Sequence, residues 1–159
     1  MARITVNTTG TQPIIQIGLS GANLADPNVS IAIPFVQEVT ITNSTGVYAY
    51  TDFSDVDQRK LSTPADNKIG TNIVVDDKAY FGNSSATASS AAALGIASLS
   101  TNKNVLDFKV YWNGSNTGAH YYSGSGFITN LAPKASPTQP VWITPLEIAV
   151  DGTFTTGTV

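Results

Sequence analysis

The stretch from 120 to 154 constrains the fold most, because it reads as two β-strands joined by a proline-rich connection. The first strand covers 120–131 and contains glycines, which inside a strand mark a bulge or a close approach of the backbone. The connection excludes a helix, because proline lacks the amide that a helix needs. The second strand begins at Val141, and the pair Asp151–Gly152 is a turn signal that ends it. The connecting prolines are Pro133, Pro137 and Pro140.

The chain is poor in charge for its size. It has 159 residues, of which 12% are charged and 42% hydrophobic, whereas soluble domains carry about 25% charged residues. Small polar and β-branched residues fill the difference, which favours an all-β fold whose surface is largely covered by something other than water. The net charge of −3 and the lack of a basic patch argue against dedicated nucleic-acid binding. The absence of cysteine excludes disulfides and thiolate sites.

The rest of the chain predicts strands around one helix. Alternation predicts a strand over 105–112, with Leu106, Phe108, Val110 and Trp112 on one face and the polar side chains on the other. Alternation also predicts strands over 13–19 and 29–42, the latter interrupted at Pro34. A stripe of small apolar residues predicts a helix over about 84–99, although Gly95 disfavours it. We see no domain boundary, so we expect one domain over 1–159: a β-sandwich or small barrel with one flanking helix.

The segment 43–70 behaves differently from the strands around it. It is the most charged part of the chain and carries the aromatic residues Tyr48, Tyr50 and Phe53. Long irregular loops are uncommon in compact domains and are often functional, and aromatic side chains are enriched in interface cores. We interpret 43–70 as a long extended loop that orders against a partner; a mobile surface loop is the alternative.

No motif in the sequence indicates catalysis or a cofactor. His120 is the only histidine, and no Gly-x-Ser-x-Gly spacing is present. Asp52, Asp55 and Asp57 lack the spacing of a calcium loop. Asp76 and Asp77 would point to opposite faces of a strand and so would not share a site. We therefore expect no enzyme, no cofactor and no metal. No secretion signal and no apolar run of about 18 residues is present, so no membrane partner is expected.

The closing hairpin resembles the tail tube proteins of tailed bacteriophages. The run Ser123–Leu131 is similar to the penultimate strand of that family, and the ending Asp151-Gly152-Thr153-Phe154 is similar to its last strand. The helix between strands and the excursion at 43–70 match the family layout. Pro145 departs from the pattern, because within the last strand it removes a ladder hydrogen bond unless it lies at an edge or bulge.

The resemblance implies assembly of many copies. Six copies would join their sheets into a ring, rings would stack into a tube, and DNA would pass through the lumen without specific binding. Other partners implied are the tail sheath, the tail terminator and the baseplate, with the protein located in the virion tail after assembly in the host cytoplasm. The candidates for contact between rings are Tyr48, Tyr50, Phe53 and Arg59. The candidates for the lumen are Asp76, Asp77, Asp107 and Lys109.

Two other functions fit the composition. One is a capsid decoration or stabilisation protein, or another β-protein of the virion. The other is a carbohydrate-binding module that stacks sugars on exposed aromatic rings. The rings available for it are Trp112, Tyr121, Tyr122 and Trp142. Because Trp112 and Trp142 both fall on apolar strand faces, we expect these two to pack in the core instead.

Overall fold

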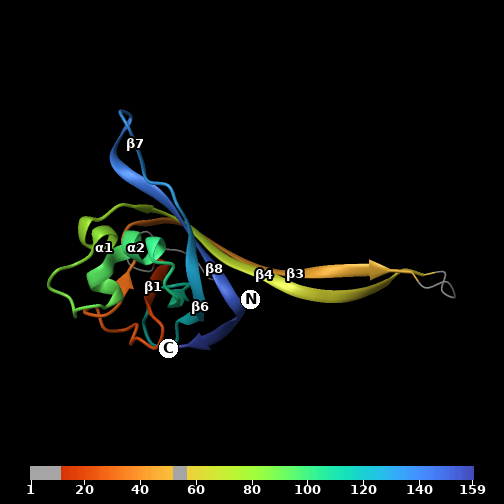
Figure 1. Cartoon of the computed structure of the whole chain (residues 1–159). Helices are drawn as coiled ribbons and strands as arrows, with labels where there is room; N and C mark the ends of the chain where they lie inside the picture. The colour runs from red at the N-terminus through yellow and green to blue at the C-terminus, as the bar shows by residue number, and fades with distance from the viewer. Residues whose placement is uncertain (1–11, 52–56) are drawn as a thin grey trace.

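The computed structural model describes residues 12–51 and 57–159. Its body is one antiparallel eight-stranded sheet in the order β2-β1-β5-β6-β8-β4-β3, with β7 paired to β8. Two helices lie together beside the body, and two long hairpins leave it in different directions (Figure 1). The strands are β1 (Ile14–Leu19), β2 (Ile31–Ala32), β3 (Val36–Tyr50), β4 (Arg59–Val74), β5 (Leu106–Tyr111), β6 (His120–Leu131), β7 (Lys134–Ser136) and β8 (Gln139–Thr158); the helices are α1 (Asp77–Phe81) and α2 (Ala91–Thr101).

The core lies between one face of the sheet and the helices. Alternate residues of the central strands point into it, as period-two patterning requires. Phe108 of β5 and Ile148 of β8 are each 1% exposed, and Ile96 and Leu99 of α2 are fully buried against them. The mainly β class predicted from the sequence is therefore confirmed.

The helical part differs from the helix predicted over 84–99. Two helices occur among the residues that the structure describes, and residues 84–90 form turns between them. Ser90 caps α2 by accepting a hydrogen bond from the Ala93 amide at 3.2 Å, which is the usual role of serine at this position. Gly95 has φ +76° and interrupts α2, so the disfavoured glycine marks a real break.

Gly95 is required because it meets the end of α1. A Cβ added there would lie 2.4 Å from the Gly82 amide nitrogen and 2.6 Å from the Tyr80 carbonyl oxygen. Gly82 also has a positive φ, +106°, and its Cβ would meet the Ala93 carbonyl at 2.2 Å. The two glycines thus let the backbones of α1 and α2 touch, which sets how the helices cover the core.

In the segment 43–70, residues 43–50 and 59–70 are regular strands and not a loop. They form the outer part of the β3–β4 hairpin, in which Asn43 pairs with Asn67 and Tyr50 with Arg59. The apolar residues Ile73 and Val74 are the end of the same 16-residue strand β4. The prediction that this segment projects as a long excursion agrees with Figure 1, where β3 and β4 extend far from the body.

The last strand is longer than the sequence predicted. The pair Asp151–Gly152 does not end β8, which runs on to Thr158. Instead, the register against β6 shifts from Ser125↔Asp151 to Ser123↔Thr155, so the glycine with φ +86° lies in a bulge. Pro145 lies one residue beyond the last β6–β8 pair, Leu131↔Leu146. The hydrogen bonds between β6 and β8 therefore do not require a backbone N–H at this position, which proline lacks.

We expect Gly95→Ala to destabilise the fold strongly. A side chain at this φ costs about 1–2 kcal/mol, and overpacking the helix contact adds about 1–3 kcal/mol. The matched control is Gly21→Ala, which has the same kind of backbone, φ +81°, but no atom within 4 Å of the added Cβ. Urea unfolding should show a loss for Gly95→Ala at least twice that of the control; equal losses would contradict the proposed backbone contact.

Candidate assembly surfaces

The most unusual surface is the outer part of the β3–β4 hairpin, residues 43–50 and 59–67, which we call the arm. β4 pairs with β8 only from Lys68 to Val74. Within the described residues, the arm strands therefore pair only with each other. A two-stranded ribbon without a third strand or a packed face is marginally stable in water. The arm consequently lacks the support that the rest of the sheet has.

The far part of the arm exposes apolar side chains on both faces. Tyr48 is 59% exposed and stacks on Tyr50, with ring centroids 6.2 Å apart. Leu61 lies opposite Tyr48 and is 55% exposed, and Val47 on the other face is 62% exposed. A register shift between Thr45 and Gly46 precedes this patch.

Three of the four residues predicted for contact between rings lie together in the arm. Tyr48 and Tyr50 alternate along one face of β3, and Arg59 is the cross-strand partner of Tyr50. Phe53 lies outside the described residues. The sequence analysis did not predict Leu61 and Val47 as contact residues. Treating 47–50 as a strand paired with 59–62 would have indicated both, because Leu61 then faces Tyr48 and Val47 lies on the opposite face.

The four residues predicted for the lumen do not form one cluster. Asp107 and Lys109 share the outer face of β5, where their neighbours in β6 are Ser125 and Ser123. Asp107 accepts hydrogen bonds from the Gly21 amide at 2.7 Å and the Ser125 hydroxyl at 2.5 Å. Lys109 lies over the Tyr121 ring, 5.0 Å from its centre.

Asp76 and Asp77 lie at the start of α1, on the core side of the sheet. The expectation that they alternate in a strand is wrong, because Asp76 is the N-cap of the helix. Its carboxylate accepts a hydrogen bond from the Ala79 amide at 3.1 Å. Asp77 occupies the first turn, where a negative charge is favourable. Both aspartates thus have a local role in α1.

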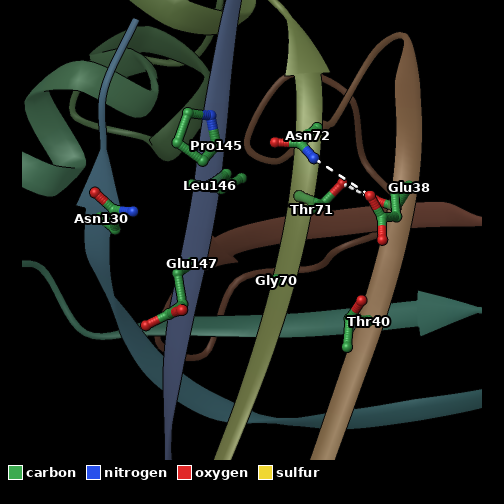
Figure 2. Close-up of a pocket in the computed structure, with 9 residues that line it drawn as sticks. All are labelled: Glu38, Thr40, Gly70, Thr71, Asn72, Asn130, Pro145, Leu146 and Glu147. Carbon is green, nitrogen blue, oxygen red and sulfur yellow. Dashed lines mark hydrogen bonds between the residues drawn. The ribbon is translucent and has the colours of Figure 1, made fainter.

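The sheet presents a second, polar surface that sequence reasoning did not single out. A shallow trough of about 210 Å³ crosses β3, β4, β8 and the end of β6 (Figure 2). The Asn72 side-chain Nδ2 donates a hydrogen bond to the Glu38 carboxylate at 3.4 Å, and Glu147 pairs with Lys68 at 3.7 Å. Alternation within the predicted strand 29–42 puts the apolar Val39 and Ile41 on one face, which indicates that Glu38 and Thr40 lie on the other.

The outer face of the sheet is acidic overall. By strand register, and leaving out the arm and the projecting hairpin of β7 with the start of β8, four carboxylates and two lysines share this face, which leaves a formal charge of −2. Burial raises the pKa of Tyr111 on the same face, and neighbouring Tyr121 raises it further. The charged residues of the face are Glu38, Asp107, Glu147, Asp151, Lys68 and Lys109.

The prediction that Trp112 and Trp142 pack in the core is wrong. Trp112 is 39% exposed and Trp142 is 58% exposed. Trp142 has the strand parity of buried Thr144, Leu146 and Ile148, but it lies beyond the end of the core. Trp112 follows the buried Tyr111 at the end of β5. Both tryptophans therefore lie beyond the ends of the hydrophobic core.

Candidate metal ligands do not cluster in the described part of the chain. Among these residues, no three His, Asp or Glu side chains gather so that they could hold a metal ion. His120 is exposed, and its Nδ1 lies 3.2 Å from the Thr158 hydroxyl. In residues 12–51 and 57–159, no helix is long and apolar enough to cross a membrane.

The fold is that of proteins from phage-like tails. A chain from the tail of a gene transfer agent particle superposes with a TM-score of 0.63 at 14% identity, over 89% of this chain and 92% of that one. A chain from the virion of a native gene transfer agent gives 0.62 at 13% identity, over 96% and 99%. A chain from the sheath–tube complex of the PVC contractile injection system gives 0.55 at 15% identity, over 98% and 93%. No family model matches the sequence, and no curated protein matches it.

We expect the arm patch to contribute little to the stability of a single copy. Leu61→Ser should change the free energy of unfolding by less than about 0.5 kcal/mol, because the side chain is exposed. Leu99→Ala, at a fully buried position, should cost about 2–5 kcal/mol. Denaturant unfolding at a concentration where the protein is monomeric measures both; comparable losses would mean that Leu61 packs within its own chain.

Proposed function

We propose that this chain is a structural protein of a phage-like tail: copies polymerise into stacked rings that form the tail tube, through which DNA passes. The observation that carries the proposal is the arm, a long two-stranded ribbon that exposes Tyr48, Leu61 and Val47. The similarity of fold to chains of phage-like tails supports it. One of those tails was refined with C6 symmetry, and we propose six copies per ring here as well.

The ring would close through the free edges of the sheet. The inner part of β3, residues 36–42, forms one edge of the sheet. Within the described residues, β8 has a free side beyond Ala149, where β4 departs into the arm. Proteins that stay monomeric usually protect such edges with lysine, proline or a very short strand. Neither β3 nor Val150–Thr158 contains lysine or proline. We propose that these two edges pair between neighbouring copies.

The arm would join one ring to the next. Docking against a neighbour would bury Tyr48, Tyr50 and Leu61 and give the ribbon the support that it lacks within one copy. Arg59, across from Tyr50, would add a planar cation suited to carboxylates or aromatic rings. Phe53 stays a prediction for the same contact.

The outer face of the sheet would line the lumen. Its excess of carboxylates would repel phosphates, so DNA would slide without binding. Asp107 and Lys109 belong to this face, together with Glu38 and Glu147. On this assignment Asp76 and Asp77, which lie with α1 on the core side, are not lumen residues.

The role proposed is structural and not enzymatic. Similar chains come from a sheath–tube complex, a sheath/tube terminator and a baseplate, and we propose a sheath, a terminator and a baseplate as partners here. The location would be the virion tail, after assembly in the host cytoplasm. A capsid decoration protein has no evident use for the arm, and Trp112 and Trp142 lie too far apart along the sheet for one sugar platform.

Electron microscopy of the purified chain over a concentration series tests the tube directly. We expect rings and hollow tubes for the native sequence. Tyr48→Ser combined with Leu61→Ser should raise the concentration needed for tubes at least tenfold, because stacking loses its apolar contact. Val105→Ser is the matched control, since Val105 is 53% exposed but lies outside the arm. A chain that stays monomeric or trimeric at every concentration would overturn the proposal.

Reversing charge on the outer face tests the lumen. Tubes of Glu38→Lys with Glu147→Lys should retain short DNA at low salt and release it as salt rises, because the wall becomes cationic. Asp77→Lys on α1 is the control and should leave DNA retention unchanged. If only the tubes of Asp77→Lys retained DNA, α1 and not the outer face of the sheet would line the lumen.

A further inference from the structure

A chain of aromatic rings connects the core to one end of the sheet. Phe108 is buried, and its ring centroid lies 6.2 Å from that of Phe154. Phe154 lies 5.3 Å from Tyr122, and Tyr122 lies 5.7 Å from Trp112, which is 39% exposed. The apolar layer of the fold therefore continues to the surface at this end and stops without a covering element in the described residues.

A groove of about 400 Å³ opens beside the last rings of this chain. Its walls are the aromatic pair Trp112 and Tyr122, together with His120, Tyr121 and the end of β8 at 156–158. We call it the aromatic groove. It is large enough for an indole side chain, and the rings of Trp112 and Tyr122 lie there beside the threonines at the end of β8.

The opposite end of the same sheet carries an exposed tryptophan. Trp142 lies where β8 enters the hairpin with β7, which projects from the body (Figure 1). Its side chain is 58% exposed, while its carbonyl accepts a hydrogen bond from the Val75 amide at 2.8 Å. The backbone of Trp142 is thus hydrogen-bonded to the body, whereas its ring is largely exposed to solvent.

We propose that copies stack end to end, with Trp142 of one copy inserted into the aromatic groove of the next. This inference rests on the proposed tube and identifies a second contact between rings, separate from the arm. A polymer that grows along one axis needs two different and complementary patches on opposite ends of the subunit. Trp142 and the groove are such a pair, and joining them continues the apolar layer from one copy into the next.

The charges of the two ends are compatible with this contact. Lys134 is the single charged residue between Leu131 and Pro145, and it lies across from Ile143, next to Trp142. The groove lining contains no lysine or arginine. The faces of Trp112 and Tyr122 are electron-rich and attract a cation such as the Lys134 ammonium.

The two ends also set an upper limit for the spacing of the rings. Trp142 and Thr156 of the groove lie about 14 residues apart on β8, and a strand rises about 3.3 Å per residue. The strand between the two ends therefore contributes at most about 46 Å to the axial repeat of the tube, and less if β8 is tilted or curved; the contact between Trp142 and the groove adds the thickness of the side chains that meet there. This limit follows from the end-to-end contact alone.

Disulfide capture tests the contact, because the chain contains no cysteine. Val141→Cys and His120→Cys are prepared separately, so that Trp142 is kept, and equal amounts are mixed, assembled and gently oxidised. We expect a dimer linked between positions 141 and 120, identified by mass spectrometry of the peptides. Lys103→Cys, also at an exposed position, replaces His120→Cys as the control and should give no dimer with Val141→Cys.

Microscopy of the same samples separates the possible failures. Tubes with the 141–120 link support the end-to-end contact. Tubes without that link, or with only 141–141 links, overturn it and leave the tube proposal standing. A sample without rings or tubes overturns both. As a second variant, Trp142→Ser should raise the concentration needed for tubes at least tenfold while the unfolding midpoint stays within error; unchanged assembly would overturn the contact.

Discussion

The apolar core is shorter than the strands that enclose it, and the other features of the molecule depend on this mismatch. Buried side chains occupy the middle of β8, at Thr144, Leu146 and Ile148, whereas Trp142 on the same face is exposed. The outer halves of β3 and β4 leave the sheet together as a two-stranded ribbon. In the described part of the chain, these two segments pair only with each other. A strand that extends beyond the hydrophobic core exposes backbone edges and apolar side chains. Both kinds of exposed surface favour association with other copies of the chain.

Association would resolve each of these exposures in a different direction. In the proposed tube, the free edges of the inner part of β3 and of the end of β8 would meet neighbours in a ring. The arm, Trp142 and the aromatic groove would contact other rings. The low charge content would then have a physical reason, because a subunit enclosed by copies of itself needs few solvated side chains. Four of the eleven Asp and Glu residues lie on the outer face of the sheet.

The sequence predicted the strand faces well, because alternation depends only on local geometry. The paired strands 106–111 and 120–131 and the outward position of Asp107 follow from that pattern. The pattern says nothing about where the core ends, so Trp112 and Trp142 were expected inside. The arm lacked a one-sided apolar pattern because both of its faces are exposed, and it was therefore mistaken for a loop. The turns at 84–90 and the bulge at Gly152 depend on tertiary contacts that no local signal reveals.

Hydrogen exchange of the arm amides tests the central claim most directly. Residues 43–50 and 59–67 form a ribbon without further support, so in the monomer their amides should exchange much faster than those of β5 and β6. Assembly should slow arm exchange at least tenfold while β5, already buried, changes little. Arm amides that are equally protected in monomer and assembly would show that the ribbon is stable alone, and the account of the arm as an assembly element would be wrong.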